Sequence, residues 1–129
     1  MILREIATLL QQSGIGTVGT NIFIGQLPAK VENAIMLVAV PSPEPDKDTG
    51  IEYQNFEVWS RYKEYSDGYD KLQAVFDLLN RRDDYYLPSY EMYFTHALGR
   101  IEDLDRDIEG RKLLKLSFRV IYRQLDLIS

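Results

Sequence analysis

The fold of this chain is decided by residues 111–123, which read RKLLKLSFRVIYR. Successive side chains of a β-strand point to opposite faces of a sheet, so residues two apart share a face. One face of this stretch is apolar and carries Leu114, Leu116, Phe118, Val120 and Tyr122. The other face is polar and basic and carries Lys115, Ser117, Arg119 and Arg123. This alternation predicts a half-buried strand with one side toward the core and a basic outer side.

The rest of the chain alternates between helical and strand patterns. Apolar residues at helical spacing predict helices over residues 2–13 and 67–81, with Gly14 ending the first and Ser66 capping the second. Four more strands are predicted at 21–25, at 34–40, at 51–63 with a bulge near 54–55, and at 85–96, where Pro88 interrupts the pattern. Residues 34–40 are apolar throughout, which indicates a strand buried on both faces. The order α-β-β-β-α-β-β predicts an α+β fold: a single mixed or antiparallel sheet of about five strands with two packing helices.

Length and composition narrow the class of protein. The 129 residues predict one domain, 1–129, because domains commonly contain about 100–150 residues. The net charge of −5 argues against binding that depends on neutralising nucleic-acid phosphates. With no cysteine, the chain has no disulfides, thiolate metal sites or cysteine catalysis. Charged residues interrupt the apolar N-terminus, and no window approaches the roughly 20 apolar residues of a membrane span, so we expect a soluble, unexported protein without membrane contact.

Residues 41–50, PSPEPDKDTG, form a biased segment with three prolines at alternate positions. The segment has three acidic residues, Glu44, Asp46 and Asp48, and no large apolar side chain. Prolines deny the backbone regular pairing, and nothing apolar anchors the segment. We therefore predict a mobile loop that becomes ordered when the protein assembles.

A second charged loop, residues 99–111, precedes the decisive strand. Asp103, Asp105 and Asp107 have the spacing of the first three ligands of an EF-hand calcium loop. The required glycine is replaced by Ile108 and the bidentate glutamate by Leu114, so a solvated or interface loop is favoured over calcium binding. No catalytic nucleophile accompanies the loop, which indicates docking to another protein.

Two further motifs contain residue types that occur in cofactor-binding or catalytic sites. Residues 14–19, GIGTVG, match the glycine string of dinucleotide-binding folds, but that site needs a strand before the string and a helix after it. Here the predicted order is inverted, which favours helix termination and a turn. His96 is the only histidine in the sequence, and it continues an alternating pattern with Tyr90, Met92 and Phe94. This pattern favours a structural or interface histidine over a catalytic one.

Four stretches together resemble a known family over nearly the whole chain. They are the opening helix with SGIGTVGTNIFIGQLP at 13–28, the apolar strand at 34–40 with the loop after it, the strand ending near Arg61 with the following helix, and residues 99–111 leading into 116–121. This combination resembles the tail terminator, or minor capsid (tail completion), family of tailed bacteriophages. The added charge at 101–105 and the tyrosine-rich stretch at 85–93 depart from the family pattern.

The resemblance implies a structural virion protein, assembled in the cytoplasm of a bacterial host, that forms a ring on the finished tail tube. Such a ring is typically hexameric, stops tube growth and provides the surface for head-tail joining. Its expected partners are its own copies, the tail tube protein and a head-completion or connector protein, while DNA passes through the lumen without specific binding. No catalysis, metal or cofactor belongs to this role.

We expect the assembly interfaces to involve charged side chains of the two loops and of the outer strand faces. These candidates are Glu44, Asp46, Asp48, Arg61, Asp103, Asp105, Asp107, Arg111 and Arg119. Two alternatives stay open from the sequence. One is another neck or connector protein of the virion, and the other is a small nucleotide-binding enzyme that uses the glycine string.

Overall fold

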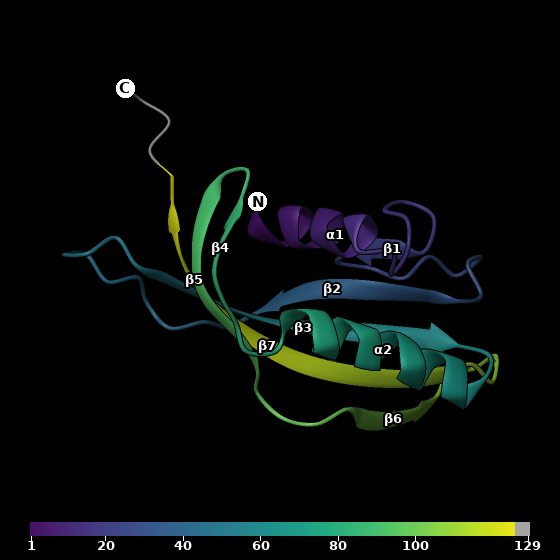
Figure 1. Cartoon of the computed structure of the whole chain (residues 1–129). Helices are drawn as coiled ribbons and strands as arrows, with labels where there is room; N and C mark the ends of the chain where they lie inside the picture. Colours follow the sequence, from purple (N-terminus) through teal and green to yellow (C-terminus); the bar gives the residue numbers. More distant parts are fainter. Residues whose placement is uncertain (126–129) are drawn as a thin grey trace.

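Strand β7 (Lys112–Gln124) organises the computed structural model, which describes residues 1–125 (Figure 1). In this part of the chain, seven strands form one mixed sheet in the order β1-β2-β3-β7-β5-β4, and β6 also pairs with β7. The elements that precede β7 are α1 (Ile2–Gln12), β1 (Ile22–Ile24), β2 (Ala34–Val40), β3 (Glu52–Tyr62), α2 (Tyr65–Leu79), β4 (Arg82–Leu87), β5 (Tyr90–Ala97) and β6 (Glu102–Arg106). The α+β fold with a mixed sheet and two helices is confirmed.

β7 is long enough to pair with three strands. Along one edge it pairs with β3 over the whole length of β3, from Glu52↔Tyr122 to Tyr62↔Lys112. The other edge is shared, because β5 pairs with its C-terminal half and β6 with its N-terminal half. A hydrogen bond from the Leu98 amide to the Ser117 carbonyl, 2.8 Å long, bridges the place where β5 ends.

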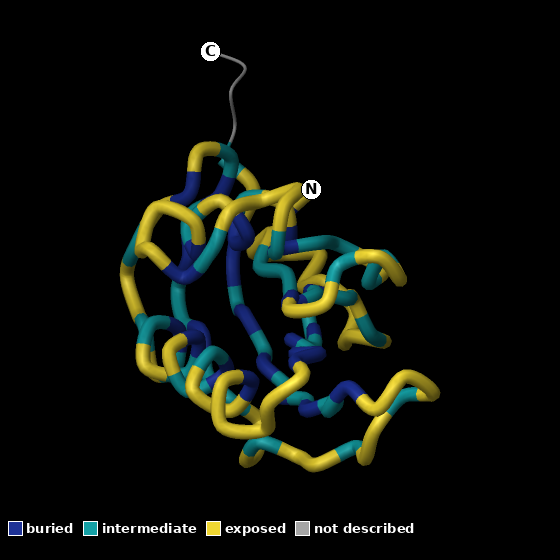
Figure 2. Tube along the Cα trace, turned by 90° about the vertical axis from the view of Figure 1, so that its right-hand side faces the viewer, coloured by how far each residue is buried: buried dark blue, intermediate teal, exposed yellow. Residues whose placement is uncertain are grey.

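Both helices pack on one face of the sheet, which is called the inner face below. The predicted apolar side of β7 lies there: Leu114, Leu116, Phe118, Val120 and Tyr122 are all buried. Phe118 stacks on Phe56 of β3 with ring centroids 5.4 Å apart. Buried side chains of α1 and α2 complete the core on this inner face. Figure 2 shows the buried residues between the helices and the sheet, and the exposed residues along loops and outer helix surfaces.

Neither helix of residues 1–125 packs on the outer face of the sheet. Its side chains are half-buried, among them Glu57, Trp59, Lys115 and Arg119. Residues 25–33, which connect the parallel strands β1 and β2, cross one end of this face and contact Arg61. On the outer face of β2, Met36 and Val38 are only half-buried, so the prediction of burial on both faces is wrong. The apolar run reflects a strand near the sheet edge with an apolar but partly open outer side.

The structure has more strands than the sequence pattern indicated, for local reasons. The predicted strand at 85–96 is a hairpin, β4 and β5, because Pro88 and Ser89 form its turn. β6 lies in the stretch expected to be a charged loop. α2 spans Tyr65–Leu79 and not 67–81: it begins at Tyr65 without a side-chain cap, so Ser66 does not cap it.

The predicted bulge near 54–55 is wrong, since β3 pairs with β7 there without a register shift. A bulge instead lies in β5 between Met92 and Phe94. It turns Phe94 and His96 to the outer face while Tyr90 and Met92 remain buried on the inner face. The four residues therefore do not share one face, contrary to their alternation in the sequence.

Candidate assembly surfaces

Residues 41–50, here called the acidic arm, connect β2 to β3 and project from one end of the sheet (Figure 1). The start of the arm is bound to β3, because Ser42 Oγ accepts a hydrogen bond from the Asn55 amide at 2.8 Å and the Pro41 carbonyl accepts one from Asn55 Nδ2 at 3.3 Å. Farther along, Asp46 Oδ1 accepts hydrogen bonds from the amides of Asp48 and Thr49, at 2.9 and 3.3 Å. These bonds lower the pKa of the Asp46 carboxyl. Nearly all side chains of the arm are exposed, and within residues 1–125 neither Glu44 nor Asp48 forms an ion pair. The arm therefore offers uncompensated negative charge, and its mobility stays a prediction.

At the opposite end, two arginines expected at an interface are buried inside the subunit. Arg61 donates from Nη2 to the carbonyls of Pro28 and Val31, at 2.5 and 2.7 Å. Arg111 donates from Nη1 to the carbonyls of Ala29 and Val31, at 2.9 and 3.3 Å, and from Nε to Asp107 Oδ2, at 2.8 Å. We call Arg61, Arg111, Asp107 and the carbonyls of residues 27–31 the arginine cluster.

The arginine cluster joins the β1–β2 connection to strands β3 and β7. Arg61 and Arg111 are only 7% and 8% exposed, so their guanidinium groups bond within the subunit. Burial, together with the positive charge of Arg111, lowers the pKa of Arg61. Desolvation alone would raise the pKa of Asp107, but hydrogen bonds from Arg111 and from the Glu109 amide lower it. The cluster thus works within the subunit as a clamp, and an interface role for it stays untested.

The remaining predicted residues lie on separate surfaces. Asp103 of β6 forms an ion pair with Lys112, and hydrogen bonds from Lys112 and from the Asp105 amide lower its pKa. Asp105 is exposed, with a positive φ of 77°. Arg119 lies on the outer face, where its Nε donates to Asn55 Oδ1 at 2.8 Å. The structure brings Arg61, Asp107 and Arg111 together, and it places Arg119 near the start of the arm, because the Asn55 side chain bonds both Arg119 and the Pro41 carbonyl.

Two charged groups on the outer face were missed by sequence reasoning. Lys115 Nζ lies 3.4 Å from Glu57 and 3.5 Å from Glu102, and although burial opposes it, these carboxylates raise its pKa. Glu91 accepts hydrogen bonds from Arg123, Tyr86 and Tyr93, at 2.7, 3.1 and 3.2 Å. Alternation correctly placed Lys115 and Arg123 on the outer face, but their partners come from strands distant in sequence.

The glycine string has its backbone groups occupied by the protein itself. The Thr17 amide donates to Asn21 Oδ1 at 2.7 Å, and the Val18 amide donates to Gln11 Oε1 at 2.8 Å. A Cβ on Gly16 would lie 2.7 Å from Asn21 Oδ1, so close packing requires glycine there. The string follows α1 and leads into β1, which is the reverse of a phosphate-binding turn.

Residues 1–125 offer no cluster for a metal ion. No group of three His, Asp or Glu side chains in this range is arranged to hold a metal ion. His96 stacks on Phe94, with ring centroids 5.3 Å apart.

A cavity of about 460 Å³ beside α2 is lined by Asn21, Asn33, Tyr62, Asp67, Asp70, Lys71 and Ala74. Neither described helix is long and apolar enough to cross a membrane.

Comparison with known proteins decides the family. Residues 9–124 match the family described as "Bacteriophage tail terminator protein". The chain belongs to this family. As a tail terminator family member, it is a structural protein of a phage tail, and the family resemblance inferred from the sequence is confirmed. No protein of the curated set matches it significantly.

Solved structures share the tail terminator's fold. Nine chains match, among them one from a structure titled "Virion of native gene transfer agent (GTA) particle". That chain is 18% identical, the match covers 83% of this chain and 81% of that one, and the TM-score is 0.59. At this identity the likeness establishes the arrangement of helices and strands alone.

Proposed function

We propose that this protein caps the phage tail tube as a ring of six identical subunits, the number that the family resemblance implies, and ends tube elongation. The observation that carries the proposal is the family match over residues 9–124. Once in place, the ring provides the surface for joining the filled head. Its partners are then the tail tube protein on one side and a head-completion or connector protein on the other, and the finished protein resides in the virion after assembly in the bacterial cytoplasm.

The charge and surface of the subunit suit this role. A closed ring needs two different, complementary surfaces on each subunit. The acidic arm and the outer face of the sheet are two such surfaces, one acidic and one carrying Arg119. The net charge of −5 would let DNA pass through a lumen without specific binding, because like charges repel.

Another neck or connector protein of the virion remains the competing function. Mixing the purified protein separately with finished tails and with filled heads, followed by negative-stain microscopy, distinguishes the two. A tail terminator decorates one end of the tail tube, whereas a head-completion protein decorates the portal vertex of the head. Decoration of heads alone would overturn the proposal.

The same experiment carries an internal control for specific binding. Glu32→Lys with Asp70→Lys changes two exposed acidic residues away from the arm and from β6. We expect this variant to decorate tails as the parent does.

A nucleotide-binding enzyme would instead be stabilised against heat by ATP or NAD. We expect no shift of the melting temperature with either nucleotide, because the glycine string already uses amides of Thr17 and Val18 for hydrogen bonds within the protein.

A further inference from the structure

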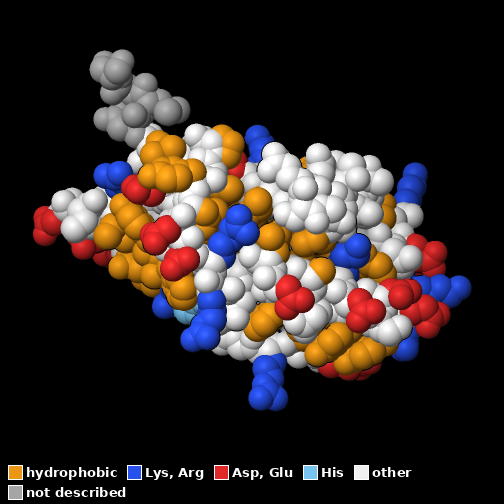
Figure 3. Space-filling view, viewed as in Figure 1, with side chains coloured by type: hydrophobic (Ala, Val, Ile, Leu, Met, Phe, Trp, Pro, Cys, Tyr) orange, Lys and Arg blue, Asp and Glu red, His pale blue; other side chains and the backbone are white. Residues whose placement is uncertain are grey.

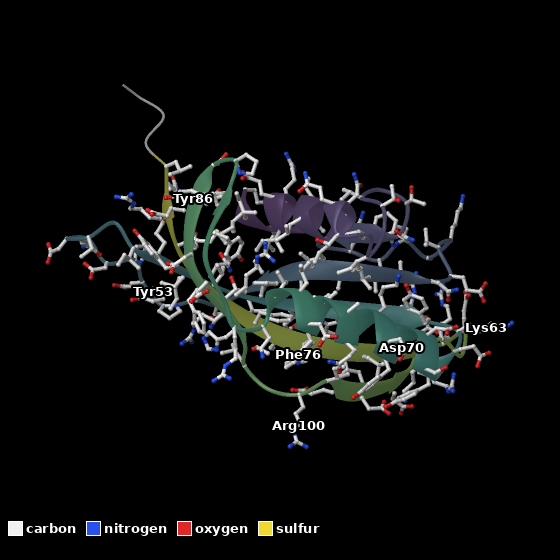
Figure 4. The ribbon with its side chains drawn as sticks, in the orientation of Figure 1. Tyr53, Lys63, Asp70, Phe76, Tyr86 and Arg100 are labelled. Carbon is white, nitrogen blue, oxygen red and sulfur yellow. The ribbon has the colours of Figure 1, made fainter. Side chains whose placement is uncertain are left out.

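A patch of aromatic and apolar side chains lies open on the outer face, at the end from which the arm projects. The register places Tyr53 of β3, Ile121 of β7 and Phe94 of β5 side by side, and all three are half-buried. Figure 4 shows Tyr53 at this end and Lys63 at the opposite one. Figure 3 shows hydrophobic side chains gathered here, bordered by basic side chains and the histidine. Both helices pack on the other face, so neither covers this row.

The next row of the same face is basic. His96 lies in register with Arg119, and Arg119 with Asn55. Lys115 and Arg123 of the same strand each have a carboxylate within 3.5 Å, whereas Arg119 bonds a neutral amide and has no ion pair within the described residues. Tyr53, Phe94, Ile121, His96 and Arg119 are called the outer patch below. It combines half-buried aromatic rings with one guanidinium that has no ion pair within the described residues.

The acidic arm has the chemistry that fits this patch. Its prolines, Pro41, Pro43 and Pro45, restrict the residues before them to extended or polyproline backbone. Such segments dock on aromatic surfaces with little loss of conformational entropy. In a polyproline helix with three residues per turn, Pro41 and Glu44 share one edge, so a ring and a carboxylate reach the same surface together.

We propose that the acidic arm of one subunit docks on the outer patch of a second copy, with proline rings on Tyr53 and Phe94 and the Glu44 carboxylate at Arg119. This inference rests on the proposed ring and names its contact. Asn55 of the same subunit binds the arm at Pro41 and Ser42, and the residues after Ser42 project from this end of the sheet (Figure 1), so a neighbouring copy is the natural acceptor for them. Because arm and patch are different surfaces, repeating the contact produces a ring or a filament.

Cysteine cross-linking tests the contact directly, since the chain has no native cysteine. Pro43→Cys in one copy is mixed with His96→Cys in a second, tagged copy, and the mixture is mildly oxidised both free in solution and bound to tail tubes. We expect disulfide-linked heterodimers, which form only when the two Cβ atoms approach to about 3.5–4.5 Å. Pairing Pro43→Cys with Ala74→Cys, on the exposed side of α2, is the matched control and should yield few.

Charge reversal provides the second part of the test. Glu44→Lys with Asp48→Lys, or Arg119→Glu alone, should weaken subunit association about tenfold or more by sedimentation, because like charges then meet. The triple variant restores opposite charges and should recover association. Equal cross-linking to His96→Cys and Ala74→Cys overturns the contact, as does failure of the triple variant to recover. If tails are capped without the cross-link, the contact is wrong and the function stands; if the cross-link forms but tails are ignored, the function fails.

Discussion

Replacing Arg111 by alanine should destabilise the folded subunit by about 3 kcal/mol. Arg111 is 8% exposed and donates from Nε to Asp107 and from Nη1 to the carbonyls of Ala29 and Val31. Removing one member of a buried ion pair costs roughly 3–5 kcal/mol. We take the lower end because Arg61 still donates to the Val31 carbonyl and the Asp107 carboxylate keeps its bonds from backbone amides.

Urea unfolding followed by the fluorescence of Trp59, the single tryptophan, measures this loss. Arg100→Ala, at an exposed position without a hydrogen bond in the described residues, should change the free energy of unfolding by less than about 0.5 kcal/mol. Arg111→Lys keeps the charge but not the forked geometry, and should lie between the two. An Arg111→Ala protein as stable as Arg100→Ala, yet defective in assembly, would refute the clamp and support an interface role.

Three further outcomes follow from the structure. Phe118→Ala removes a fully buried ring stacked on Phe56 and should lower the free energy of unfolding by about 3–5 kcal/mol; a loss below about 1 kcal/mol would contradict the core assignment. The pKa values of Asp103 and Asp107 are lowered in the folded state, so their ionised carboxylates stabilise the fold at pH values above the unfolded-state pKa of about 3.9. The free energy of unfolding should therefore fall as the pH drops below about 4, and it should fall less steeply in the double variant Asp103→Asn with Asp107→Asn. Amides of residues 42–49 should exchange with almost no protection in the free subunit, and strong protection would oppose a mobile arm.

The inner face of β7 was predictable because alternation over thirteen residues depends on few outside influences. Phe118 and its apolar neighbours are buried as the pattern indicated. The hairpin of β4 and β5 was missed because a proline can end a strand or merely interrupt it, and the pattern alone does not distinguish these. The face of Phe94 and His96 depended on a bulge, which is set by pairing with β7 and not by local sequence.

The sequence predicted the charge and exposure of some candidate interface residues better than it predicted where the others lie in the fold. The acidic arm is exposed as its composition indicated. The burial of Arg61 and Arg111 was not predictable, because a charged side chain is seldom buried without partners, and their partners are backbone carbonyls about 30 and 80 residues away in sequence. Sequence does not specify backbone acceptors, so such clusters become visible only in the folded structure.

The most direct test of the tail terminator role is the length of tail tubes grown in the presence of this protein. Purified tube protein is polymerised, the protein is added, and fresh tube protein follows, with lengths and tube ends measured by negative-stain microscopy. The account predicts ring-shaped density at one end of each tube and no further growth from that end. Tubes that continue to lengthen from ends carrying this protein, or tubes it never binds, would contradict the account.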